Sequence, residues 1–166
     1  KKHFEKTLVE ISGELVGSVA ALEHPTKNKK LNYGEIFLRD NVPVMIYLIT
    51  QKRYEIVKKF LSVCLELQST NYQTRGVFPT SFVEENGKLI GDYGQRSIGR
   101  ITSADASLWW PILCWYYVNK SGDYAFGKSQ SVQRGIQLLL DLVLHPTFEG
   151  TPCLLYTSPS PRDDPL

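Results

Sequence analysis

Residues 40–68 read Asp-Asn-Val-Pro-Val-Met-Ile-Tyr-Leu-Ile-Thr, then Gln-Lys-Arg, then Tyr-Glu-Ile-Val-Lys-Lys-Phe-Leu-Ser-Val-Cys-Leu-Glu-Leu-Gln. The first part is apolar on nearly every side, which predicts a helix over about 40–50 that is buried all round. The last part has apolar residues at helical spacing and charges opposite them, which predicts an outer helix over about 54–68 with one wet face. Because only a short polar stretch separates the two, we expect an antiparallel helical hairpin.

The same order returns further along the chain. Residues 106–119 are again apolar on all sides, and residues 129–144 are amphipathic. Pro111 inside the first of these runs predicts a bend or a late helix start. Two all-apolar helices, each followed by a half-apolar one, are typical of an α/α toroid, in which inner helices are buried and outer helices are wet on one side. A plain helical bundle remains an open alternative.

The other segments are predicted as a leading helix and a long loop. Residues 3–22 carry apolar side chains at steps of three and four, which is typical of an amphipathic helix. Residues 70–102 lack helical periodicity and are rich in glycine, so we expect a structured loop with short strands at about 77–83 and 88–91. Loops of this length in compact domains are usually functional. The predicted fold class is all-α.

Composition excludes several classes of protein. The 166 residues are 42% hydrophobic and 22% charged, with a net charge of +2, too balanced to suggest a nucleic acid or a membrane surface as partner. No apolar run reaches the roughly 18 residues of a membrane span, and the first residues lack a signal-peptide pattern. Cys64, Cys114 and Cys153 are scattered without metal-ligand spacing. We therefore expect free thiols, no structural zinc and a cytoplasmic location, with an organelle as the alternative for the parent protein.

Two aspartates stand at the heads of the two all-apolar helices. Asp40 and Asp105 are candidate active-site carboxylates, although an N-cap is the simpler interpretation of an aspartate before a helix. Two features favour chemistry at Asp105: the glycine-rich loop leads into it, and Trp109 falls on the same helical face. An acid desolvated beside an indole has a raised pKa, which keeps it protonated and able to donate to a leaving oxygen.

Neighbouring residues are candidates for binding a sugar. Arg39 could hold Asp40 ionised or donate to sugar hydroxyls, and an ordinary ion pair is the alternative. Trp109 and Trp110 could stack on a sugar ring, and core packing is the alternative for at least one of the tryptophans at 109, 110 and 115. Phosphate loops, dinucleotide fingerprints and serine or cysteine nucleophile motifs are absent from the sequence, so we expect no cofactor.

Several strings carry a family resemblance. They are Leu-Asn-Tyr-Gly-Glu-Ile-Phe-Leu-Arg-Asp at 31–40, Arg-Gly-Val-Phe-Pro-Thr-Ser-Phe at 75–82, Asp-Tyr-Gly at 92–94, Gly-Arg-Ile-Thr at 99–102, Asp-Ala-Ser-Leu-Trp-Trp at 105–110, and the segment 133–146. In this order they resemble the alkaline and neutral invertases, glycoside hydrolase family one hundred. The resemblance implies part of an (α/α)6 toroid of helical hairpins that hydrolyses sucrose to glucose and fructose with inversion, without metal or cofactor.

The resemblance also implies roles for individual residues. It makes Asp105 the general acid and places Arg39 and Asp40 in the wall that binds the glucosyl unit; we expect Trp109, Trp110 and Arg100 to contact substrate as well. An inverting glycosidase needs a second carboxylate as base. In the family that base would lie beyond residue 166, so the chain alone is expected to be inactive.

Two departures from the family pattern stand out. Gly34-Glu35-Ile36 replaces the common Asp-Gln-Cys, and Gln95-Arg96 replaces Glu-His, which leaves the sugar specificity open. Residues 153–166 are rich in proline and serine and unlike the family, so we predict a partial catalytic domain over 1–152 and a non-native, disordered tail. A genuine linker is the alternative.

Other functions remain open at this point. The alternatives are another α/α-toroid glucosidase, acting on trehalose or a sucrose-like glucoside, and a non-catalytic helical binding domain. The expected partner is a small sugar, with no nucleic acid or membrane, and oligomerisation of the parent enzyme is left open. Part of a toroid would expose the apolar side chains of its inner helices, among them Val44, Ile46, Leu108 and Ile112, so we expect the isolated chain to aggregate or oligomerise.

Overall fold

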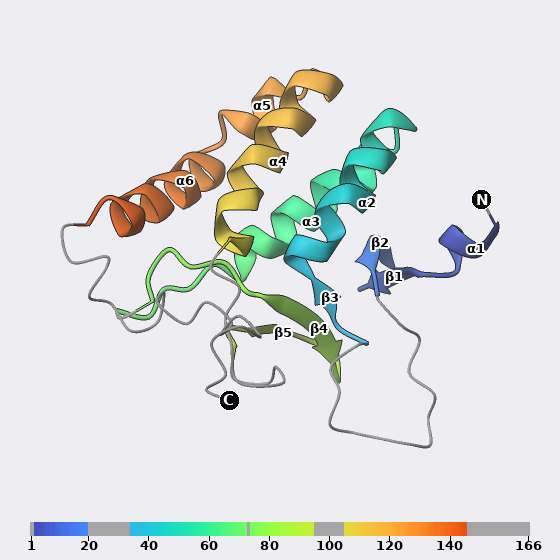
Figure 1. Ribbon diagram of the computed structural model, residues 1–166, viewed down its shortest axis with the longest axis horizontal. Coiled ribbons are helices and arrows are strands. Elements are labelled where there is room, and N and C mark those ends of the chain that lie inside the picture. The colour runs from blue at the N-terminus through green and yellow to red at the C-terminus, as the bar shows by residue number, and fades with distance from the viewer. Residues whose placement is uncertain (1, 20–33, 73, 95–104, 146–166) are drawn as a thin grey trace, which may run out of the picture.

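The computed structural model describes residues 2–19, 34–72, 74–94 and 105–145. The helices after the N-terminal region are α2 (Leu38–Thr50), α3 (Tyr54–Glu66), α4 (Ala106–Ser121), the one-turn α5 (Tyr124–Gly127) and α6 (Gln130–Val143). The first two form the predicted hairpin, α4 lies beside them, and α6 follows on the far side of α4 (Figure 1). The four helices predicted for this part are confirmed, with ends displaced by at most two residues.

The leading helix predicted over 3–22 is wrong for residues 3–19, the part of it that the structure describes. The chain there forms a short helix and two antiparallel strands: α1 (Lys2–Glu5), β1 (Leu8–Ile11) and β2 (Glu14–Ser18). Ser12 and Gly13 join the strands with φ of 52° and 80°, the left-handed pair that a tight two-residue hairpin turn requires. A glycine between short runs rich in β-branched residues favours this turn, and the apolar spacing used for the helix did not take it into account.

A second sheet lies beneath the start of α2. Its strands run in the order β3 (Ile36–Phe37), β4 (Ser81–Glu85) and β5 (Lys88–Asp92), all antiparallel. Asn86 and Gly87, with φ of 53° and 72°, form the turn between the last two strands. Both strands predicted in the long loop therefore exist, the first displaced toward the C-terminus. The described part of the chain is mixed in structure, which corrects the all-α prediction.

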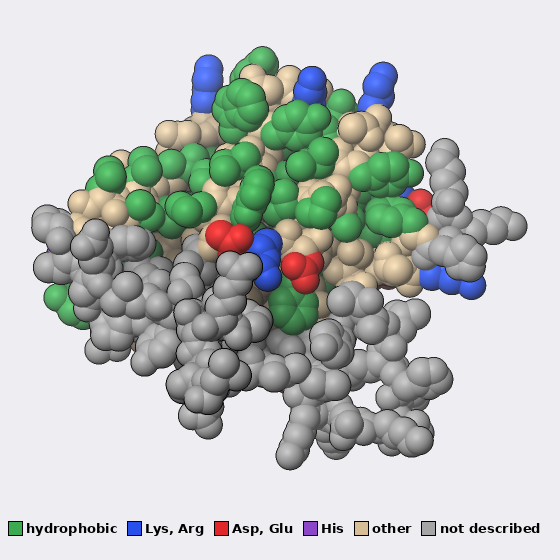
Figure 2. All heavy atoms as spheres, in the orientation of Figure 1, with side chains coloured by type: hydrophobic (Ala, Val, Ile, Leu, Met, Phe, Trp, Pro, Cys, Tyr) green, Lys and Arg blue, Asp and Glu red, His purple; other side chains and the backbone are tan. Residues whose placement is uncertain are grey.

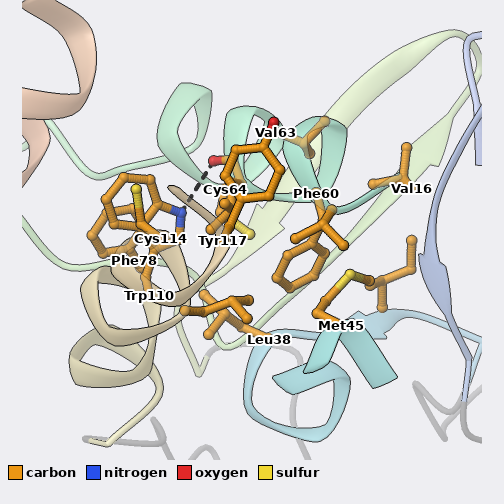
Figure 3. Packing of buried hydrophobic residues seen from close by; sticks show 14 of the residues in the cluster. Val16, Leu38, Met45, Phe60, Val63, Cys64, Phe78, Trp110, Cys114 and Tyr117 are labelled. Atoms are coloured by element: carbon orange, nitrogen blue, oxygen red, sulfur yellow. Dashed lines mark hydrogen bonds between the residues drawn. The ribbon is translucent and has the colours of Figure 1, made fainter. Parts of the chain in front are cut away.

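The core lies where α3 meets α2, α4 and the sheets. Phe60 and Cys64 on the buried side of α3 face Met45 of α2 and Tyr117 of α4 (Figure 3). Both cysteines of the described chain, Cys64 and Cys114, are buried and free, as expected. Burial raises the pKa of the Cys114 thiol to about 11, so it stays protonated and packs as a small apolar side chain.

The two helices expected to be buried all round each have an exposed apolar side. Ile46 of α2 is 39% exposed, and Ile112 and Trp115 of α4 are 52% and 66% exposed. Figure 2 shows the same feature as a broad hydrophobic surface over the helices. We call the exposed side chains of these two helices the apolar face; its members are Ile46, Tyr47, Leu108, Trp109, Ile112 and Trp115. Complete burial of these helices is therefore wrong for this chain, and closure of a toroid stays a prediction.

We expect the 166-residue chain to self-associate through the apolar face. The double substitution Ile112→Gln and Trp115→Gln should lower the average mass measured by analytical ultracentrifugation, because it replaces the two most exposed apolar side chains of this surface. Leu140→Gln is the matched control, since Leu140 is 46% exposed on α6 but lies outside the apolar face. A monomeric wild-type chain at micromolar concentration would contradict the prediction.

A polar cluster joins α3, α4 and the start of α5. Asp123 accepts hydrogen bonds from Lys58 Nζ at 2.7 Å, from Tyr117 Oη at 3.0 Å and from the Phe126 amide at 3.0 Å. The Lys58 bond is the main reason why the pKa of Asp123 is lowered from 3.8. Desolvation and the Asp123 carboxylate raise the pKa of Tyr117 to about 12, so the phenol remains a donor throughout the neutral range.

Asp123→Asn should flatten the loss of stability at acid pH. A carboxyl whose folded-state pKa is below its unfolded value stabilises the fold above the unfolded pKa, and this contribution is lost as the pH falls through the folded pKa. Below about pH 4, urea denaturation should therefore show a steeper decline for the wild type than for Asp123→Asn. Lys58→Met should reproduce the flatter curve, and equal acid slopes in all three proteins would contradict the assignment.

Candidate active site

The N-termini of α2 and α4 lie next to each other above the β3–β4–β5 sheet (Figure 1). Each start is held by hydrogen bonds that come from distant parts of the sequence. The Leu38 amide donates to Thr80 O at 2.9 Å, and the Asn41 side chain bonds to both backbone groups of Ser18 and to Phe37 O. The Phe78 amide donates to Ser107 Oγ of α4 at 3.0 Å. The two helix starts are therefore placed by Ser18 of β2 and by residues 78–80, which lead into β4.

Arg39 brings together the two aspartates that the sequence singled out. Its Nη1 lies 3.3 Å from Asp105 Oδ1, and its Nε lies 3.7 Å from Asp40 Oδ1. The three side chains are between 50% and 59% exposed. In Figure 2 a basic side chain lies between acidic ones at the border of the hydrophobic surface. The arrangement combines hydrogen-bond donors and acceptors with an adjacent apolar wall, which is a chemistry suited to sugars.

The aspartates differ in their relation to the helix ends. Asp40 was expected to cap its helix, but α2 begins earlier, with Phe37 at the N-cap, and Asp40 lies in the first turn. Asp105 does occupy the N-cap position of α4, and its side chain makes no capping hydrogen bond. Both carboxylates still benefit from the positive end of a helix dipole, worth roughly 0.3–1 kcal/mol each. This modest structural role leaves the carboxyl of Asp105 oriented toward Arg39.

The tryptophans divide between core and surface. Trp110 is fully buried, stacks on Phe78 with ring centroids 4.7 Å apart, and donates from Nε1 to Leu61 O at 3.1 Å. Trp110 therefore packs in the core, which was the alternative to stacking on a sugar ring. Trp109 is 37% exposed on the apolar face, one helical turn after Asp105, and is available to stack on a ligand. Trp115 is more exposed but lies further along the helix.

Some candidate residues lie outside the described part of the chain, and two residues that hold the site were missed by the sequence analysis. Arg100, Cys153 and the tail 153–166 lie outside the described residues. Sequence reasoning missed Asn41 and Ser107, whose side chains hold the two helix starts. Their polar character inside otherwise apolar runs was the available signal, but the partners are far away in sequence. Among the described residues, no group of three or more histidine, cysteine, aspartate or glutamate side chains is placed to hold a metal ion.

Comparison with known proteins identifies the family to which this chain is similar. The model of the family described as alkaline and neutral invertase matches residues 1–162, a range that extends into the predicted tail. The mitochondrial neutral/alkaline invertase 1 of Oryza sativa subsp. japonica is 37% identical over 93% of this chain. The alkaline/neutral invertase CINV2 of Arabidopsis thaliana is 33% identical over 90% of it.

The matched regions are only parts of these relatives. The aligned residues cover 27% of the rice protein and 29% of the Arabidopsis protein, so the chain spans less than a third of their length. The names of the relatives include mitochondrial, chloroplastic and cytosolic forms, so the similarity does not determine a compartment. None of the helices within the described ranges is long and apolar enough to cross a membrane.

Proposed function

Because this chain belongs to the alkaline and neutral invertase family, we propose that it is part of a glycoside hydrolase that cleaves sucrose into glucose and fructose. The observation that carries the proposal is the contact of Arg39 with both Asp40 and Asp105 at adjacent helix starts. The sequence pattern indicates each of these residues separately, and in the fold Arg39 lies within 4 Å of both aspartates. A purely structural surface pair would contribute roughly 1 kcal/mol or less.

In this proposal Asp105 is the general acid. Its carboxyl protonates the oxygen that joins glucose to fructose while a water molecule attacks the anomeric carbon from the opposite face. Inversion requires a second carboxylate that activates this water, about 6.5–9.5 Å from the acid. We place that base in a further part of the whole protein, and we therefore expect the 166-residue chain to be inactive by itself.

Arg39, Asp40 and Trp109 bind the glucosyl unit. The guanidinium and the Asp40 carboxylate supply charged donors and acceptors for sugar hydroxyls, and the indole supplies a flat apolar surface. The bound glucosyl unit lies against these groups and excludes water from the Asp105 carboxyl beside them.

The expected surroundings of the enzyme follow from the same proposal. It acts on a small sugar without a cofactor, and the two cysteines among the described residues, which are buried and free, suit a reducing compartment such as the cytosol. Fractionation of the source cells would test this location against the mitochondrial and chloroplastic alternatives that relatives represent.

The test is hydrolysis of sucrose by the full-length protein, followed by proton NMR. Inversion at the α-glucosidic carbon should release β-glucose first, with α-glucose appearing only as mutarotation proceeds. Initial release of α-glucose would contradict inversion. Cleavage of trehalose but not sucrose would support a different glucosidase, and binding of sucrose without cleavage would support a non-catalytic binding domain.

A further inference from the structure

The short segment Phe78–Thr80 lies beneath the candidate site and is hydrogen-bonded to both of its helices. Thr80 O accepts the Leu38 amide at the start of α2, and the Phe78 amide donates to Ser107 in the first turn of α4. Pro79 lies between these two contact points and restricts the backbone there. The Thr80 amide also donates to Asp92 O of β5 at 2.7 Å, so this segment is itself held in the sheet.

The two contact points are close in sequence to the charged groups of the site. Arg39 is the residue after Leu38, and Asp105 is two residues before Ser107. The segment Phe78–Thr80 therefore sets the separation between the guanidinium and the carboxyl through one short stretch of backbone. We propose that Ser107 is a positioning residue for the general acid: its hydrogen bond to the Phe78 amide places Asp105 beside Arg39. This inference rests on the proposed function of Asp105.

Ser107 acts through position and not through contact with substrate. Two residues along an α-helix correspond to a rotation of roughly 200°, so Ser107 and Asp105 lie on opposite sides of α4. Ser107 is 4% exposed, whereas the Asp105 side chain is 50% exposed. A hydroxyl on the buried side cannot reach a sugar on the exposed side.

The contacts of α2 and α4 explain why Ser107 matters for the geometry. The start of α2 is held by the Leu38 amide and by three hydrogen bonds of the Asn41 side chain. In α4, Trp110 anchors the helix to Phe78 and Leu61 almost one turn further in. Ser107 connects the turn that carries Asp105. Without its hydroxyl, α4 remains docked through Trp110, but its first turn can move relative to Arg39.

The experiment compares crystal structures and kinetics of the full-length wild type with three variants. Ser107→Ala removes the acceptor, and Ser107→Thr retains it. Gln68→Leu is the matched control, because Gln68 is buried and donates to the Gly76 and Gly135 carbonyls, away from the site. If Ser107→Ala does not fold, Ser107→Cys replaces it, since a thiol has similar size and is a weaker acceptor.

The expected result is specific to Ser107. Ser107→Ala should lengthen the Arg39–Asp105 contact beyond salt-bridge distance, lower kcat for sucrose by about 10- to 100-fold and leave KM within about twofold, because a displaced acid slows only the chemical step. Ser107→Thr should restore both the contact and kcat. Gln68→Leu should lower the melting temperature without changing either.

Failure of the inference is distinguishable from failure of the proposed function. An unchanged Arg39–Asp105 contact in Ser107→Ala overturns the inference, as does a lengthened contact with normal kcat. If the wild type does not cleave sucrose, the proposed function fails, and the inference fails with it as a statement about catalysis. In that case, loss of the contact in Ser107→Ala alone would still support Ser107 as the residue that places Asp105.

Discussion

Asp105→Asn should lower kcat/KM for sucrose in the full-length protein by about 10²- to 10⁴-fold, the range that general acid catalysis contributes. Asparagine has nearly the same shape and retains a side-chain oxygen facing Arg39, but it cannot donate a proton as a carboxylic acid does. The fold should be preserved, because the Asp105 side chain makes no capping hydrogen bond and is half exposed. Initial-rate measurements with circular dichroism as the folding check would establish this.

The control for this substitution is Asp141→Asn. Asp141 is an exposed acid on α6 that accepts a hydrogen bond from Gln137. Its replacement should leave activity within about twofold, since exposed positions away from a site have small effects. Near-normal activity of Asp105→Asn would mean that another residue is the general acid and that Asp105 serves only at the start of α4.

Trp110→Ala should destabilise the fold by about 3–5 kcal/mol, the usual cost of removing a large aromatic side chain from a core. The indole is fully buried, it stacks on Phe78, and its Nε1 donates to Leu61 O. Truncation would leave a cavity between α3 and α4 and a carbonyl without this donor. Trp110→Phe should cost less, about 1–3 kcal/mol, because a smaller aromatic ring remains while the donor and part of the buried volume are lost.

Urea denaturation of the 166-residue chain would measure these differences, in the Ile112→Gln and Trp115→Gln background where association is expected to be weakest. Tyr72→Ala serves as the control, because the Tyr72 side chain is 97% exposed. It should change the free energy of unfolding by at most about 0.5 kcal/mol. A loss of less than about 1 kcal/mol for Trp110→Ala would be inconsistent with its place in the core.

The candidate site could be foreseen only as separate residues. The head of each apolar helix identified Asp40 and Asp105, and the adjacent Arg39 was clear from its position. Their meeting depends on Leu38 and Ser107 bonding to one segment around Pro79, and these partners lie between 29 and 42 residues away. Sequence periodicity describes which side of an element is apolar, but it carries no information on such distant hydrogen bonds.

The helices also show what sequence periodicity can and cannot predict. Periodicity correctly located α2, α3, α4 and α6, because local spacing decides which residues can form one buried side. It did not separate a short hairpin from a helix over 3–22, where the turn at Ser12 and Gly13 determined the outcome. Nor did it distinguish Trp110 from Trp109. These neighbours have the same residue type, and only the packing of Phe78 and Leu61 against one side of α4 places the first in the core and leaves the second partly exposed.

The amino-acid sequence by itself determined α2, α3, α4 and α6, the family and the identity of the charged residues, because each of these depends on local pattern. Only the tertiary structure decided which of those residues meet and which tryptophan remains available. The reason is that both depend on contacts between segments distant in the chain, chiefly residues 78–80 before β4, which hold the starts of α2 and α4.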